Sequence, residues 1–256
     1  GLKGIEVAAA AGALYGDANA KLEVLSSATR EQIEELPEYV QNTNITVQHI
    51  EQGHVFDLEI NVYYEQEHAS VRIVDTHTNI VQIEKDWKVI FEDKTTSLEH
   101  KADHSALIWD FAKTVDIEDV KEILDRQIAC NMAIANEGIH NSYGANIGHV
   151  ILNMDLDCVK TRAKAYAAAG SDARMNGCEL PVVINSGSGN QGITCCVPVV
   201  VYAKELNSTQ EQLYRALVLS NLTAIYIKTG IGTLSAFCGA VSAGAAAGAG
   251  IAYLHD

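Results

Sequence analysis

The sequence predicts an α+β protein in two parts: a strand-rich antiparallel portion with helices over residues 1–103, and an all-helical, catalytic-type domain over 104–256. Three observations support this. Apolar and polar residues alternate from Asn44 to about Asp93, in segments rich in Val, Ile and Tyr that are typical of half-exposed strands. Helical spacing dominates the rest. A polar linker, EDKTTSLEHKADHS, separates the two textures and marks a domain boundary.

The first part contains two predicted helices and five predicted strands. GLKGIEVAAAAGALYGD is rich in strong helix formers and stops at a Gly–Asp pair. ATREQIEELPEYVQ places Ile33, Leu36 and Val40 on one face, and Pro37 is expected to kink or end this helix. The strands are ITVQHI, VFDLEINVYYE, ASVRIVD, NIVQIEKD and WKVIFED. Short turn-like breaks between them favour an antiparallel meander.

The second part contains three clear helical patterns before its end. DIEDVKEILDRQIACNMAIANEG has Asp116 as a candidate N-cap and Gly138 as a candidate end. DLDCVKTRAKAYAAAGSDARMNG repeats the pattern, and in STQEQLYRALVLSNLTAIYIKTG we expect Ser208 to cap the helix and Gly230 to lie past its end. The final run from residue 229 to 254 has no charged residue. Its small residues and lack of basic flanks favour a buried helix, or a broken pair, over a membrane span.

Composition narrows the range of partners. A formal net charge of −15 repels nucleic-acid phosphates and anionic lipid surfaces, so we expect neither nucleic acid nor membrane as a partner. Six irregularly spaced cysteines and no charged-then-apolar leader indicate a reducing cytoplasm, in which thiols are free to bind metal. The chain opens on Gly1 rather than Met, which predicts a preceding N-terminal segment of the same protein as a partner. A homo-oligomer is left open.

The stretch CELPVVINSGSGNQGITCC, residues 178–196, contains a glycine-rich loop. Gly187, Gly189 and Gly192 fit the G-x-G-x-x-G pattern, but a dinucleotide site needs a helix between two strands. If VVVYAKE is the next strand, only Ile193–Pro198 lie between, and a proline ends that short piece. We therefore interpret the fingerprint as accidental. The loop either binds a carboxylate through its N–H groups or forms a tight corner that needs glycine, and composition favours neither.

The cysteines give no C-x-x-C and no Cys/His zinc pattern. Cys130 and Cys158 lie in helical patterns and are predicted to be core thiols. The adjacent pair Cys195–Cys196 points in two directions, so at most one of them could share a metal with Cys178. Cys178 and Cys238 each lie beside a glycine in a small-residue segment. Thiolates that far apart in sequence can ligate an iron–sulfur cluster if the fold brings them together.

Two long motifs carry a resemblance to a known family. GSDARMNGCELPVVINSGSGNQGITCCVPV and GIGTLSAFCGAVSAGAAAGAGIAYL resemble the serine dehydratase alpha-chain family, most closely its L-cysteine desulfidase branch. The opening KGIEVAAAAGALYGD and the strand-rich middle are similar to that branch as well, so the resemblance covers the whole chain. It implies a lyase that uses an oxygen-sensitive 4Fe-4S cluster, without pyridoxal phosphate. Such enzymes convert L-cysteine to pyruvate, ammonia and sulfide, or L-serine to pyruvate and ammonia.

The resemblance also implies roles for particular residues. The cluster cysteine that precedes the family's glycine loop corresponds to Cys178, and the one in its L-S-A-x-C-G segment corresponds to Cys238. Family members carry a further cysteine near the N-terminus, in a Cys-Thr-Glu-Pro-like motif, as a third ligand or as the base, and nothing in this chain matches it. The chain therefore resembles the C-terminal part of a complete member, which need not hold a cluster or be active alone. The implied substrate-binding residues are Asn185, Ser186, Gly187, Ser188, Gly189, Asn190 and Gln191.

The implied chemistry is α,β-elimination from a small amino acid. A cluster iron without a protein thiolate would act as a Lewis acid on the leaving β-thiol or β-hydroxyl, while a base removes the α-proton. His140 and His149, in the polar break NSYGANIGH, are the candidate bases, although a lone histidine is more often merely hydrogen-bonded. Two alternatives remain: an L-serine dehydratase of the same fold, and a metal-free protein that binds small carboxylates.

Overall fold

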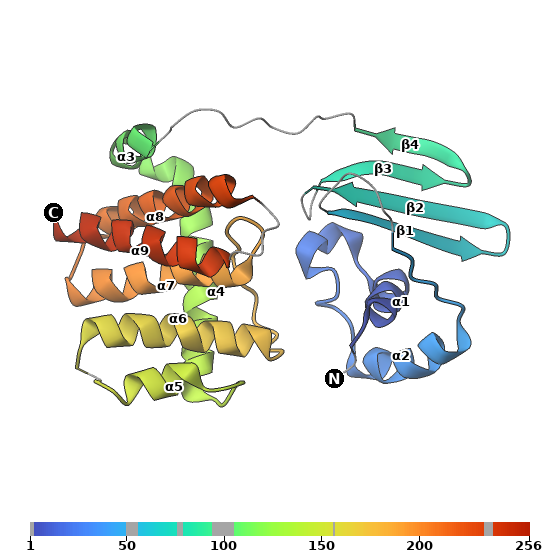
Figure 1. Cartoon of the computed structure of the whole chain (residues 1–256), viewed down its shortest axis with the longest axis horizontal. Helices are drawn as coiled ribbons and strands as arrows, with labels where there is room; N and C mark the ends of the chain where they lie inside the picture. The colour runs from blue at the N-terminus through green and yellow to red at the C-terminus, as the bar shows by residue number, and fades with distance from the viewer. Residues whose placement is uncertain (1–2, 50–55, 76–78, 94–104, 156, 233–237) are drawn as a thin grey trace. The chain divides into compact units, whose positions relative to one another are not determined.

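The computed structural model describes residues 3–49, 56–75, 79–93, 105–155, 157–232 and 238–256 (Figure 1). The chain forms two compact units, residues 1–97 and 98–256. The domain boundary expected at residue 103 lies outside the described residues. Helices and one four-stranded antiparallel sheet make up the described chain, which confirms the predicted α+β class.

The first unit begins with helices. These are α1 (Ile5–Tyr15), the 3-10 helix η1 (Ala18–Glu23) and α2 (Arg30–Asn42). A reciprocal capping box between Thr29 and Gln32 starts α2. Pro37 lies inside α2 rather than at its end, because the helix loses only one N–H donor there and Leu36 is buried against Ala10 and Ala11 of the neighbouring helix.

The sheet of the first unit is a meander in the order β1-β2-β3-β4, with every neighbouring pair antiparallel. Its strands are β1 (Asp57–Tyr64), β2 (Glu67–Val74), β3 (Ile80–Lys85) and β4 (Lys88–Glu92). Asp86 and Trp87, both with positive φ, form the two-residue turn between β3 and β4. The fifth predicted strand, ITVQHI, is wrong over its described residues 45–49, which are irregular. Alternation alone makes no strand where no ladder partner exists.

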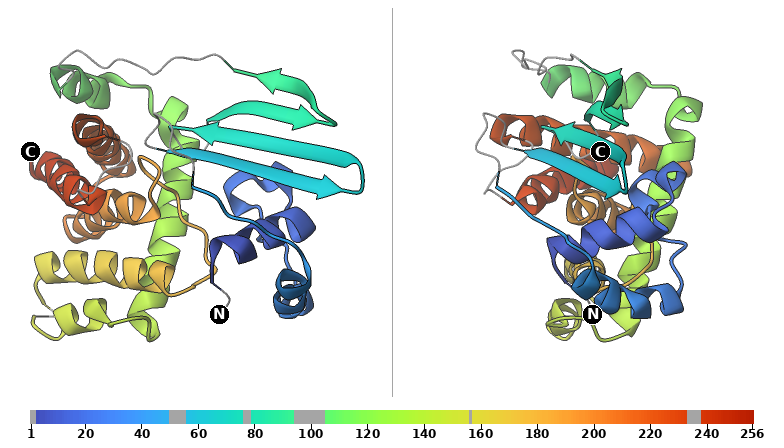
Figure 2. Two further views of the ribbon diagram at one scale, coloured as in Figure 1. Left: turned by 45° about the vertical axis from the view of Figure 1, so that its right-hand side comes forward. Right: turned by 90° about the vertical axis from the view of Figure 1, so that its right-hand side faces the viewer.

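The second unit is a bundle of helices (Figures 1 and 2). In chain order they are α3 (Ser105–Thr114), α4 (Ile117–His140), α5 (Ile147–Leu152), α6 (Val159–Met175), α7 (Gly189–Glu205), α8 (Gln210–Ile231) and α9 (Gly239–His255). Asp116 caps α4 as predicted, since its carboxylate accepts a hydrogen bond from the backbone N–H of Glu118 at 3.1 Å.

Three predicted helix ends are wrong. Gly138 lies inside α4, where a Cβ would come within 2.1 Å of the Ala169 carbonyl oxygen, so this glycine allows α4 and α6 to approach closely instead of ending the helix. Thr209, not Ser208, caps α8. Gly230 lies inside α8, which ends at Ile231 and has as its C-cap Gly232, a glycine with φ of 83°.

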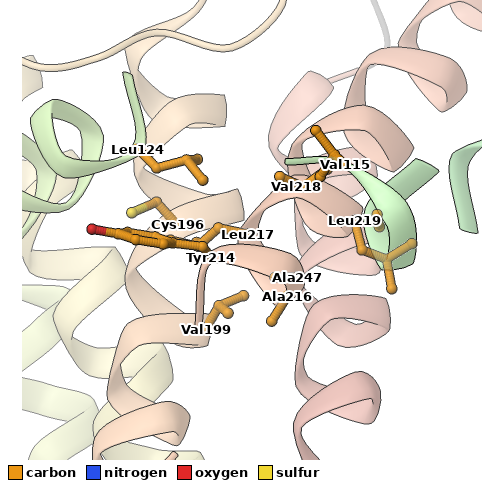
Figure 3. Packing of buried hydrophobic residues seen from close by; sticks show 11 residues of the cluster. Val115, Leu124, Cys196, Val199, Tyr214, Ala216, Leu217, Val218, Leu219 and Ala247 are labelled. Carbon is orange, nitrogen blue, oxygen red and sulfur yellow. The ribbon is translucent and has the colours of Figure 1, made fainter. Parts of the chain in front are cut away.

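The main core of the bundle lies where α4, α7, α8 and α9 meet (Figure 3). Its largest contributors include Leu217 and Val199, both fully buried, with the ring of Tyr214 beside them. Small residues on α9 allow this closeness, because a Cβ at Gly250 would lie 2.7 Å from the Ala216 carbonyl oxygen.

The uncharged C-terminal run is divided between two helices, since α8 ends at Ile231 and α9 begins at Gly239. Within the described residues, no helix is both long enough and apolar enough to span a bilayer. Of the two expected forms, a buried helix or a broken pair of helices, the described residues show the broken pair.

Candidate functional site

The glycine loop forms a tight turn that leads directly into α7. Asn185 and Ser188 exchange backbone hydrogen bonds of 3.1 and 3.0 Å, and the two residues between them have φ values of 49° and 78°. The second of these is Gly187, which adopts the left-handed conformation without steric cost. The Ser188 hydroxyl accepts from the N–H of Gln191 and caps the helix. Among the described residues, the N–H groups of Gly189 and Asn190 have no acceptor, so the turn presents open donors.

The prediction that no helix follows the glycine loop is wrong. VVVYAKE is not a strand but the second half of α7, which runs from Gly189 to Glu205 with Pro198 inside it. A helix therefore does begin at the glycine loop. The preceding PVVIN contains no strand, and the described part of the helical unit contains no sheet. A dinucleotide fold needs a strand before and a strand after this helix, and the described residues form neither.

A buried network of side-chain amides holds the loop in place. The Asn185 side chain donates to the Asn221 side-chain oxygen at 3.0 Å and to its backbone oxygen at 3.2 Å. Asn221 and Gln127 exchange two further amide hydrogen bonds, of 2.8 and 2.9 Å. Asn185 and Gln127 are 4% and 3% exposed, so each depends on these bonds for satisfaction. Sequence reasoning missed this network; its only signal was polar residues on otherwise apolar helix faces.

A second anchor holds the segment that enters the loop. The fully buried Asn131 side chain accepts from the Val183 N–H at 2.8 Å and donates to the Val183 carbonyl at 3.1 Å, as a neighbouring strand would. Gly192 packs directly onto the same place, because a Cβ there would lie 2.0 Å from the Val183 carbonyl oxygen. The position of the loop is therefore fixed on two sides.

The start of α9 lies against the first turn of α7. Gln191 is 4% exposed, and its amide carbon, nitrogen and oxygen lie within 2.6 Å of where a Cβ at Gly239 would be. The Gln191 Oε1 atom is buried, with no hydrogen-bond partner among the described residues. The neighbouring Cys238 is the N-cap of α9; it is exposed and its thiol makes no capping bond.

Cys178 lies three residues after α6, in the segment that leads to the loop. Its N–H donates to the Ala173 carbonyl at 3.0 Å, and its half-buried thiol packs near Tyr143. The Tyr143 hydroxyl donates to the Glu137 carboxylate at 2.9 Å. This hydrogen bond, followed by burial and the nearby Cys178 thiol, raises the pKa of Tyr143 to about 12. Neither Tyr143 nor Glu137 had been singled out from the sequence.

Both cysteines belong to one end of the bundle, where α6 ends and where α7 and α9 begin (Figures 1 and 2). A 4Fe-4S cluster is commonly held by up to four cysteine thiolates. Over the part of the chain that the structure describes, no three His, Cys, Asp or Glu side chains are grouped to hold a metal. Cys178 and Cys238 thus fit as two thiolate donors at most, and the remaining ligands would have to come from elsewhere.

The candidate bases lie at the end of α4 and on α5. His140 is exposed, and its Nδ1 contacts the Asn136 carbonyl at 2.7 Å. His149 lies on α5, with its Nε2 at 2.6 Å from the Ile139 carbonyl. In both figures α6 lies between α7 and α5, the helix that carries His149.

The remaining cysteines differ sharply in environment. Cys195 and Cys196 are fully buried; burial raises the pKa of Cys195 to about 12 and that of Cys196 well above its usual value. The prediction that Cys130 and Cys158 are core thiols is wrong, since both are only half-buried. Cys158 is the N-cap residue of α6, where the nearby backbone N–H groups of Thr161 and Lys160 lower the pKa of its thiol.

Alkylation should report these differences. In the folded, metal-free protein at pH 8, we expect iodoacetamide to modify Cys158 and Cys238 first, and Cys195 and Cys196 only after unfolding, because the thiolate is the reacting form. Peptide mass spectrometry after timed quenching measures the order. Early modification of either member of the buried pair would contradict the burial described above.

Comparison with known proteins identifies the family to which the chain belongs. The model of the family described as serine dehydratase alpha chain matches residues 19–256, and the chain belongs to that family. It is 50% identical to a UPF0597 protein of Desulfitobacterium hafniense, covering 100% of this chain and 61% of the relative. It is also 49% identical to a UPF0597 protein of Lachnoclostridium phytofermentans, covering 99% of this chain and 62% of the relative.

A third relative, a UPF0597 protein of Finegoldia magna, is 46% identical over the whole chain and 62% of its own length. The chain thus spans about three fifths of the curated relatives it matches. No solved structure matches it.

Proposed function

We propose that the full-length protein is a lyase that catalyses α,β-elimination from L-cysteine and uses a 4Fe-4S cluster. In this proposal the present chain supplies the substrate loop, Asn185 to Gln191, and two cluster ligands, Cys178 and Cys238. Family membership supports the lyase class. The observation that carries the proposal is the position of the loop: it opens α7 at the same end of the bundle as the segments that bear the two thiols.

The residues of the loop would bind and orient the substrate. Open N–H groups at the start of α7 suit a carboxylate, because the helix N-terminus favours negative charge. Around them, Ser186, Ser188, Asn190 and Gln191 would align the bonds that break. A bound cluster would supply an open iron position as Lewis acid for the leaving β-substituent. His140 and His149 are our proposals for the base that takes the α-proton.

Two other functions have specific support. The family is named for serine dehydratase, which favours elimination of water from L-serine by the same site. The open N–H groups at the start of α7 would also suit a metal-free protein that binds small carboxylates. Measuring sulfide and ammonia release from L-cysteine and L-serine distinguishes the proposed cysteine lyase from a serine dehydratase. Measuring the iron and acid-labile sulfide content of an anaerobic preparation distinguishes both lyases from a metal-free binding protein.

Serine substitutions test the ligand assignment. In the full-length protein prepared anaerobically, Cys178→Ser and Cys238→Ser should each lower iron content and reduce elimination by roughly 100-fold or more, because a lost thiolate weakens the cluster. Cys130→Ser, at a half-buried thiol of α4, is the matched control and should retain both. Normal iron content and turnover in either test variant would remove that cysteine from the proposed site.

A further inference from the structure

Arg174 carries a guanidinium group with no carboxylate partner. It lies at the end of α6, and its Nη1 atom contacts only the Asn190 side-chain oxygen at 3.3 Å and the Met175 sulfur at 3.4 Å. Among the described residues no acidic side chain pairs with it. Other arginines do have such partners: Arg30 with Glu34, Arg72 with Asp57, Arg162 with Glu205 and Arg215 with Glu211. In a chain of net charge −15, an arginine that stays unpaired at a candidate site indicates an outside anion.

The glycine loop makes room for this guanidinium. A Cβ at Gly189 would lie 2.2 Å from the Arg174 Nε atom and 2.8 Å from its Cζ atom. Gly189 does not have positive φ, so its backbone would accept other residues, and glycine is needed there for space alone. Arg174 therefore lies directly against the first residue of α7, beside the N–H groups that have no acceptor.

A second, independent observation points to a ligand at the same turn. The Gln191 side chain is 4% exposed, yet its Oε1 atom has no partner among the described residues. Buried acceptors without a partner are rare in native proteins and call for a ligand or an ordered water. This acceptor and the unpaired guanidinium flank one helix start, so a ligand with both a negative group and a hydrogen-bond donor would satisfy both.

We propose that Arg174 binds the carboxylate of a small α-amino acid at the start of α7, together with the N–H groups of Gly189 and Asn190, and that Gln191 accepts a hydrogen bond from the amino group of the same molecule. The inference rests on the proposed function and names the group that selects the substrate. Amines without a carboxylate lose the charge-assisted contact and bind weakly, whatever their β-substituent.

The test uses the full-length protein prepared anaerobically, with three variants. Arg174→Gln should raise the KM for L-cysteine and L-serine by roughly 10- to 100-fold, the size expected for a lost charge-assisted bond, with a smaller effect on kcat. Gly189→Ala, which displaces the guanidinium without changing charge, should shift KM in the same direction. Arg162→Gln, at the other end of α6, is the matched control and should stay within about twofold.

Equilibrium binding separates this inference from the proposed function. Wild-type protein should bind L-serine more tightly than ethanolamine, and Arg174→Gln should reduce the difference by roughly 10-fold or more while leaving ethanolamine binding unchanged. If elimination proceeds with an unaltered KM in Arg174→Gln, the inference is wrong and the lyase function stands. If wild type shows no elimination but binds L-serine in an Arg174-dependent way, the inference stands and the lyase function falls. A wild type that binds both probes equally overturns the inference.

Discussion

Replacing Gly192 by alanine should destabilise the helical unit by roughly 3 kcal/mol or more, because overpacking against backbone cannot be relieved by a change of side-chain rotamer. The new Cβ would lie 2.0 Å from the Val183 carbonyl oxygen and 3.0 Å from the Ile184 Cα atom. Val183 has little room to retreat, since both its N–H and its carbonyl are bonded to the buried Asn131 side chain. To relieve the clash, α7, the loop or both would have to move.

Urea unfolding of the full-length protein, followed by far-UV circular dichroism, measures the loss. Gly248→Ala is the matched control: it lies on the exposed side of α9, with nothing within 4 Å of its Cβ position, and should stabilise the protein by up to about 1 kcal/mol. Equal unfolding midpoints for the two variants would contradict the close packing of α7 on the segment that precedes it.

Sequence pattern predicted the sheet better than the helix ends. Four strands follow from alternation because each has a ladder partner next to it in the chain, whereas ITVQHI alternates equally well and has none over its described residues. Gly138 was expected to stop a helix, but its missing side chain is used for contact with α6. This contact depends on Ala169, on another helix. Helix propensity describes only the local sequence and cannot predict it.

The run VVVYAKE shows the same limit more strongly. Valine-rich segments favour strands by intrinsic preference, yet here Val199 is fully buried, and Val200 and Val201 half-buried, on a helix packed against α6, α8 and α9. Burial in the bundle outweighs the small propensity difference. The error reached the site, because it hid the helix that begins at the glycine loop.

Residues of the candidate site could be predicted only where they lie in a recognisable sequence motif. Cys178, Cys238 and the loop were found because they stand in long recognisable stretches. Arg174 stands in the same stretch, but its lack of a partner exists only in three dimensions. Gln127 and Asn221 are 94 positions apart, and each looks like an ordinary polar residue within a helix. No local spacing connects them.

Asn221→Ala should cost about 2–5 kcal/mol and also weaken substrate binding. Asn221 is the common partner of Gln127 and Asn185, so its truncation leaves two amides, both more than nine-tenths buried, without their bonds. Each unsatisfied buried group costs roughly 1–3 kcal/mol. Asn185 also fixes one end of the turn that precedes Ser188, so the donors at the start of α7 should lose their fixed position.

A double-mutant cycle with Gln127→Ala distinguishes a network from two separate contacts. If the three amides act together, removing Gln127 after Asn221 should cost less than removing it alone, with a coupling energy of about 0.5–3 kcal/mol. Asn136→Ala is the matched control, since this exposed asparagine of α4 makes no side-chain hydrogen bond to another described residue and should change stability by less than about 0.5 kcal/mol. Strict additivity, with an unchanged KM, would mean that the loop holds its shape without the amides beneath it, and the explanation for its rigidity would then reduce to the Asn131 contact and the packing of Gly192.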